Sequence, residues 1–113
     1  MELIDFSRTR ADPIELFESA AASRVVIGRT GNGSLVYCLY VGPDGIIGAH
    51  PTGFCQFFLV VEGSGWVSGA DGNRIALNAG QGVRLEKGEM HSKGSDTGMT
   101  AIMIQMAEIG DEK

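Results

Sequence analysis

The chain of 113 residues has few basic residues, no long apolar run and only two cysteines, and each shortage excludes a class of protein. Nine Lys and Arg against fourteen Asp and Glu give a formal charge of −5 without any basic run, so we expect neither nucleic acid nor a membrane as a partner. The longest wholly apolar run, Leu35–Val41, is too short to cross a bilayer. The acidic N-terminus lacks the apolar stretch of a secretion signal. Because Cys38 and Cys55 lie in apolar runs, we expect buried free thiols and a cytoplasmic protein.

Glycine, in contrast, is abundant: the chain has seventeen, and they separate short runs rich in β-branched and aromatic residues. This pattern is typical of an all-β sandwich or barrel. We expect one domain over residues 1–113, with an arm, a short helix and a first strand in residues 1–33 and the barrel core in residues 34–107. The expected strands are Ser23–Arg29, Ser34–Val41, Ile46–His50, Phe54–Glu62, Trp66–Gly69, Asn73–Leu77, Val83–Leu85, Met90–Ser92 and Thr100–Ala107.

The expected helix begins near Asp12. Asp12 suits the N-cap, Pro13 suits the first helical position, and Glu15 completes a capping box. These signals predict a short helix within Ile14–Ala22. Either this helix or a second subunit would cover the apolar outer side of Cys55–Val61, and we expect a homodimer.

The only two histidines, His50 and His91, lie at opposite ends of the β-rich half of the chain. Between them Gln56 interrupts an apolar run, where burial of an amide costs about 1–3 kcal/mol unless a polar group meets it. Two imidazoles and a carboxamide oxygen can hold divalent iron, manganese, nickel or zinc. Alternatively, each histidine is an ordinary surface or capping residue, and Gln56 meets a ligand, a water or a backbone group.

The residues around His50 resemble the first motif of the cupin family. That motif has a glycine, a His-x-His pair, a glutamate a few residues on and a later glycine. Here Gly45 precedes His50, and Gly63 follows. Thr52 stands in the place of the second histidine, and Gln56 stands in the place of the glutamate.

A second cupin motif, a glycine followed by proline, glycine and histidine, is matched by Gly80, Gly88 and His91. Glu86 stands where proline is usual. The resemblance covers Ser34 to Gln105, most of the chain. It implies a double-stranded β-helix, or jelly-roll barrel, with its functional site at the centre.

The sequence leaves the function of such a barrel open. If it is an enzyme, a dioxygenase or an isomerase, His50, Gln56 and His91 would be metal ligands and Glu89 the catalytic base. If it is a metal-free carrier or sensor, the same three residues would hydrogen-bond the polar group of a small molecule. A third alternative is a barrel that associates with a partner protein. The further residues that we expect in the ligand pocket are Thr52, Phe54, Phe58 and Met90.

Overall fold

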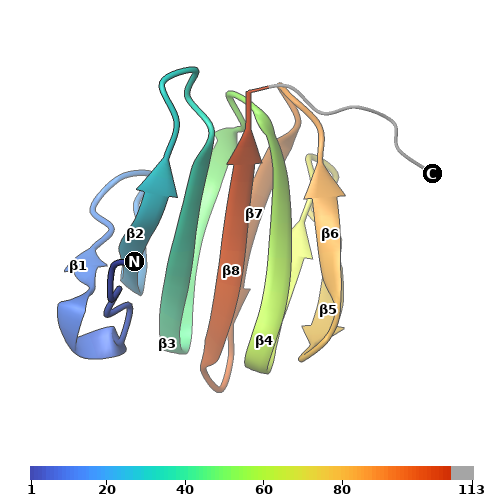
Figure 1. Ribbon diagram of the computed structural model, residues 1–113. Coiled ribbons are helices and arrows are strands. Elements are labelled where there is room, and N and C mark those ends of the chain that lie inside the picture. The colour runs from blue at the N-terminus through green and yellow to red at the C-terminus, as the bar shows by residue number, and fades with distance from the viewer. Residues whose placement is uncertain (108–113) are drawn as a thin grey trace.

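Eight strands make up nearly all the regular structure in residues 1–107, the part of the chain that the computed structural model describes (Figure 1). They are β1 (Asp12–Pro13), β2 (Ala20–Arg29), β3 (Leu35–Pro51), β4 (Cys55–Ser68), β5 (Arg74–Asn78), β6 (Gly82–Leu85), β7 (Met90–Ser95) and β8 (Met99–Met106). Every pairing between them is antiparallel. Within residues 1–107 no helix is long and apolar enough to cross a membrane.

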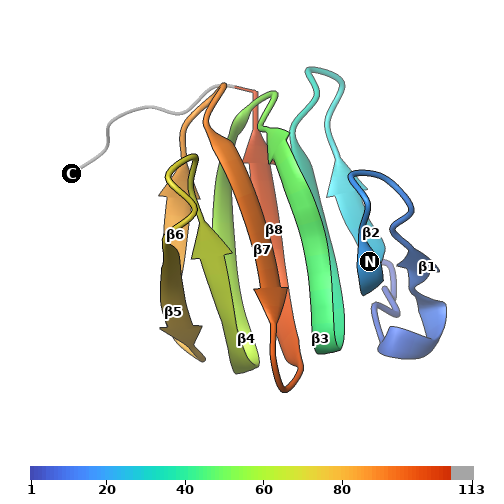
Figure 2. The same ribbon diagram turned by 180° about the vertical axis from the view of Figure 1, so that it is seen from behind.

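Two long strands, β3 and β4, each belong to both layers of the barrel. Residues 35–41 of β3 and 55–63 of β4 pair with β8, which lies between them in Figure 1. Residues 45–51 of β3 and 66–68 of β4 pair with β7, which lies between them in the reverse view of Figure 2. Because the same two strands frame both layers, the layers face each other and enclose one core. This confirms the expected all-β barrel.

The long strands bend where the sequence predicts turns between separate strands. β3 continues through residues 41–45, where Asp44 takes a φ of 59°. A Cβ added to Gly45 would lie 2.6 Å from Cγ1 of Val41, so only glycine allows this bend. β4 likewise continues through Gly63, whose φ is 74°. Four of the predicted strands are therefore two bent ones, and each bend carries its strand from one layer into the other.

The helix predicted within residues 14–22 is wrong. The helical structure in residues 1–107 is limited to one 3-10 turn, η1 (Arg8–Arg10). Asp12–Pro13 instead pair with β2, so the capping residues form a sheet edge. Phe17 and Glu18 then take φ values of 60° and 53°, which no right-handed helix contains. A segment this short cannot sustain a helix by itself, so pairing with β2 prevails.

The core lies between the two layers and follows the alternation of strand residues. On β4, Gln56, Phe58 and Val60 point inward and are buried, whereas Phe57 and Leu59 on the outer side are half-buried. We expected both faces of this strand to be buried. The inner face of β4 is buried, whereas its outer face is only half-buried. The inner apolar side chains form one cluster: Ala22, Tyr37, Leu39, Val41, Ile47, Phe58, Val60, Val67, Leu77, Leu85, Met99, Ala101 and Met103.

Candidate functional site

The two histidines lie side by side where β3 pairs with β7. His50 is the register partner of His91, and their ring centroids are 4.5 Å apart. His50 Nδ1 is 2.8 Å from the carbonyl oxygen of Gly48, and His91 Nδ1 is 3.4 Å from that of Glu89. Because a carbonyl oxygen only accepts, both Nδ1 atoms carry the proton and both Nε2 atoms are acceptors. The structure thus brings together two residues that the motif spacing singled out.

The group that meets His91 is Lys93, a residue that the sequence prediction missed. Lys93 lies two residues further along β7 on the same inward face and is only 2% exposed. Its Nζ is 3.1 Å from His91 Nε2 and 5.5 Å from the centroid of the Phe58 ring. In residues 1–107 no carboxylate forms an ion pair with it. Lys93 therefore places a positive charge in the barrel interior without a counter-charge.

Burial controls the ionisation of these three side chains. It lowers the pKa of Lys93 to about 8, so the ammonium is still mostly charged at pH 7. Burial, followed by the neighbouring charges of Lys93 and His50, lowers the pKa of His91 to about 4. Burial also lowers the pKa of His50, and Lys93 adds to that effect. Both imidazoles are therefore neutral at pH 7, and Lys93 carries the charge.

Gln56 is buried, as its place in an apolar run predicts, and one end of its amide is satisfied. Its Nε2 donates to Oε1 of Gln105 at 3.3 Å, and Nε2 of Gln105 donates to the carbonyl oxygen of Gly33 at 3.1 Å. This chain of donors fixes which way the Gln56 amide faces. Its Oε1 has no hydrogen-bond partner among the described residues. A buried acceptor in this state favours a ligand that can donate to it.

A cavity of about 680 Å³ is lined by His50, Gln56 and Lys93 and opens to the surface, whereas His91, which contacts Lys93, lies outside this lining. Its inner end consists of the buried polar and apolar residues of the lining, Tyr37, Ile47, Gln56 and Lys93, together with half-buried His50. This volume lies in the range of sites that hold small organic molecules. Burial raises the pKa of the Tyr37 hydroxyl, so this group stays a neutral donor.

Residues 12–17, where the sequence predicts the helix start, instead line this cavity on the outside. The ring of Phe17 stacks on His50 with centroids 3.7 Å apart and planes 7° apart. Gly48 makes this close approach feasible, because a Cβ there would overlap the carbonyl oxygen of Phe17. The segment therefore covers the site rather than the outer face of the barrel.

The four residues predicted for the pocket lie outside the lining of this cavity. Thr52 is buried, and its Oγ1 donates to the carbonyl oxygen of Phe54 at 2.6 Å. The ring of Phe54 lies over Gly33, and Met90 is 40% exposed. Phe58 is fully buried in the core, where its ring faces the ammonium of Lys93. The ring of Phe58 thus packs against a residue of the site without lining the cavity.

Glu89, the predicted base, stabilises a turn. Its side chain is exposed, and Oε1 accepts from the backbone N–H of Glu86 at 2.9 Å. Only its carbonyl oxygen faces the site, where it receives Nδ1–H of His91. Glu89 therefore orients an imidazole through the backbone.

The divalent metal stays a prediction, and the residues present do not fit it. Among residues 1–107 no three His, Cys, Asp or Glu side chains lie together in a way that suits a metal ion. The lone pair of His91 Nε2 faces the Lys93 ammonium, which would also repel a dication. Gln56 Oε1 is available but neutral, so no carboxylate offsets the metal charge.

The similarity of this chain to known proteins lies in its structure. No family model and no curated protein matches the sequence. A cupin-like protein from Thermotoga maritima superposes with a TM-score of 0.79 at 16% identity, covering 95% of this chain and 82% of that one. A Cupin 2 conserved barrel domain protein from Salinispora arenicola gives 0.75 at 17% identity, over 92% and 87% of the two chains. A cupin superfamily protein from Desulfitobacterium hafniense gives 0.73 at 10% identity, over 96% and 100%. The chain therefore has the fold of a small single-domain cupin, as the two motifs indicated.

Proposed function

We propose that the protein is a small-molecule-binding barrel whose ligand occupies the cavity beneath Phe17 and needs no bound metal. The observation that carries this proposal is the inner end of the cavity, where His50, Gln56 and Lys93 lie in one lining with the buried side chains of Tyr37 and Ile47. Such a combination of apolar walls and a few polar groups is typical of ligand sites.

The polar groups at this inner end are available to a ligand. His50 Nε2 is an acceptor with no protein partner in residues 1–107, because Nδ1 makes the contact to the backbone. Gln56 Oε1 is a second acceptor, and the Lys93 ammonium has donors beyond the one that His91 receives. Glu89, the expected base, faces away from the cavity. This set supports a carrier or sensor better than a catalyst.

Metal-assisted catalysis is the second candidate, and one observation favours it. Both Nδ1–H groups are held by backbone carbonyl oxygens, which is the support that metal-ligating histidines usually have. Metal analysis of protein purified without a histidine tag separates the two functions. We expect less than about 0.1 equivalent of iron, manganese, nickel or zinc, and thermal melts that these ions leave unchanged. Stoichiometric metal would favour the enzyme.

A fragment screen by NMR tests the binding function. We expect small molecules at millimolar concentration to shift the resonances of His50 and Phe17, since these rings border the cavity. Val26→Phe adds a ring to a cavity-lining side chain and should abolish the shifts. Ile75→Phe adds the same ring at a site that is 59% exposed and should leave them. Shifts scattered over the surface, or shifts that persist in Val26→Phe, would refute binding in this cavity.

A further inference from the structure

The geometry points to a small organic anion as the ligand, with its carboxylate paired to Lys93. This inference rests on the binding function proposed above and names the chemical class of the ligand. It is built on three features of the site: a buried charge without a counter-charge, an uneven placement of charges along the cavity, and an unpartnered acceptor.

The buried charge is the first feature. Lys93 is 2% exposed, and its Nζ contacts a neutral acceptor, His91 Nε2, and the face of the Phe58 ring. An ammonium has three donors, and His91 takes one of them. A buried cation without an anion is costly, so the folded chain carries an unfavourable charge that a ligand carboxylate would neutralise. The low polarity around Lys93 strengthens that pairing, since little water screens it.

The uneven charge placement is the second feature. Three carboxylates also line the cavity, those of Asp5, Asp12 and Glu15, but all three residues are exposed and belong to its outer rim. Arg10, also exposed, belongs to the same rim, and its Nε lies 4.0 Å from the carboxylate of Asp5. Arg24, a second cation of the lining, lies further in, with its guanidinium 5.0 Å from the centroid of the Tyr37 ring. The cavity is therefore positive inside and mixed in charge at its mouth. A negative group is favoured at the inner end.

The unpartnered acceptor is the third feature. Gln56 lines the same cavity as Lys93, and its buried Oε1 has no donor among the described residues. A ligand with an O–H or N–H group in addition to its carboxylate would satisfy both residues. Inside its rim the cavity offers one ammonium and the single guanidinium of Arg24 rather than a cluster of arginines or a helix N-terminus, which favours a carboxylate over a phosphate.

Isothermal titration calorimetry with matched pairs of probes tests this inference. The probes are acetate, benzoate and 3-phenylpropionate, each compared with its uncharged amide, acetamide, benzamide and 3-phenylpropionamide. We expect at least one carboxylate to bind the wild-type protein about 10-fold or more tightly than its amide, because hydrogen bonds to a charged group are stronger than neutral ones.

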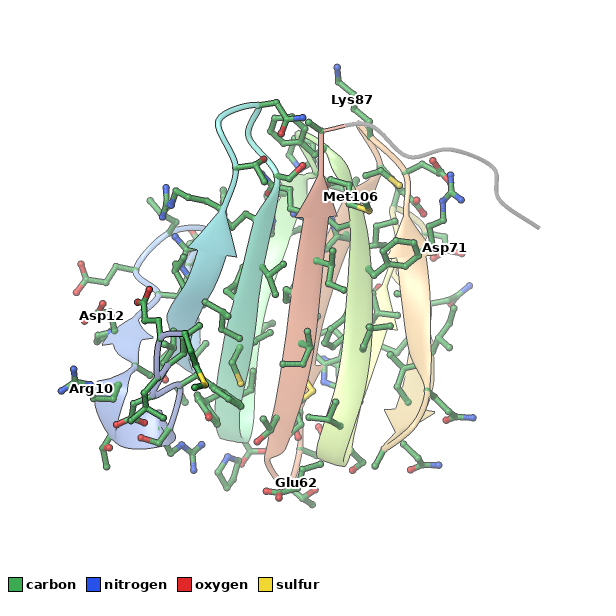
Figure 3. All side chains as sticks on the ribbon, viewed as in Figure 1. Arg10, Asp12, Glu62, Asp71, Lys87 and Met106 are labelled. Atoms are coloured by element: carbon green, nitrogen blue, oxygen red, sulfur yellow. The ribbon has the colours of Figure 1, made fainter. Side chains whose placement is uncertain are left out.

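Variants of Lys93 test whether this residue causes the preference for the carboxylate over its amide. Lys93→Met should reduce it to within about 3-fold, and so should Lys93→Gln, which keeps a donor for His91 without the charge. Lys87→Met removes a charge from an exposed lysine that points away from the barrel in Figure 3, and should keep the full preference.

Two outcomes would refute an anionic ligand and leave the binding function intact. One is that the amides bind as tightly as the carboxylates, and the other is that both Lys93 variants keep the preference for the carboxylate. Failure of all six probes to bind at 10 mM, about the weakest affinity that calorimetry detects, would overturn both.

Discussion

Replacing Lys93 by methionine should stabilise the protein, which is the reverse of what removal of a buried hydrogen-bonded residue usually does. Burial lowers the pKa of Lys93 from 10.5 to about 8, which means that folding disfavours the ammonium. Each tenfold change in proton affinity is worth about 1.4 kcal/mol, so the buried charge costs about 3 kcal/mol of folding free energy at pH 7. Methionine has a similar length, no charge and a side chain that adapts to apolar surroundings.

The sign of the pH dependence separates this cost from changes in packing. Below pH 8 the lysine is charged in both the folded and the unfolded chain, and the full cost applies. Between pH 8 and 10.5 the unfolded chain keeps the proton that the folded chain has lost, so the stability of the wild type rises with pH. We therefore expect the advantage of Lys93→Met to fall from about 3 kcal/mol at pH 7 to about 1 kcal/mol at pH 10.

Urea unfolding of both proteins at pH 7 and pH 10 measures this change. Lost packing acts equally at both pH values, so it cancels in the difference between the two conditions, whereas the energy of the contact between the charged Lys93 and His91 is part of the pH-dependent change. The histidines do not contribute, because their pKa values lie below this range. Lys87→Met controls for the change in net charge. A constant difference between wild type and Lys93→Met at the two pH values would contradict this prediction, since it would mean that the ammonium is not desolvated.

Three further predictions concern residues 12–17, which cover the cavity, and the outer face of β4. Gly48→Ala should lower the free energy of unfolding in urea by about 1–3 kcal/mol, because its Cβ would overlap the backbone of Phe17. The control Gly53→Ala adds a Cβ that meets nothing within 4 Å, so it should change this free energy by no more than about 0.5 kcal/mol. Equal effects of the two substitutions would contradict the close approach of Phe17 to Gly48. Phe17→Ala should raise the pKa of His50 toward 6.5 in an NMR titration, since it removes the stacked ring, and an unchanged pKa would show that the ring does not desolvate His50. Light scattering should give the mass of a homodimer for the wild type and of a monomer for Leu59→Lys on the half-buried outer side of β4, and a monomeric wild type would remove this prediction.

Much of the fold could be predicted from the sequence, because strands leave a strong local signal. Apolar runs separated by glycines marked all strands from β2 to β8, although the bends at Gly45 and Gly63 read as breaks. A turn signal reports a change of backbone direction and does not show whether strand pairing continues on both sides. The helix prediction was wrong for a related reason. Asp12 and Pro13 are suitable capping residues, but they pair with Arg24 and Ser23 of β2, and a capping signal does not report such a pairing.

The site was predicted in part. The cupin-like spacing predicted that His50 and His91 share one site, and in the structure their rings lie side by side. Lys93 was not predicted as a site residue for two reasons. It is the first residue of Lys93–Gly98, a segment with the composition of a loop, and buried lysines are rare. Extending the alternation from His91 would have placed Lys93 and Ser95 on the same inward face, where the structure has all three buried. The position of Phe17 over His50 could not be predicted from the residues near Phe17, since it depends on the absence of a side chain at Gly48.

A charged lysine without a counter-charge among the described residues occupies the interior of the barrel beside the two histidines. The most direct test of this arrangement is an NMR titration of the protein labelled with ¹³C at the ε carbons of lysine, followed from pH 6 to 11. We expect one lysine, absent from the spectrum of Lys93→Met, to titrate near pH 8, and its midpoint to move up when a bound carboxylate supplies the counter-charge. A Lys93 midpoint at 10.5 or above would contradict the account, because it would mean that water or an anionic group of the protein already solvates the ammonium.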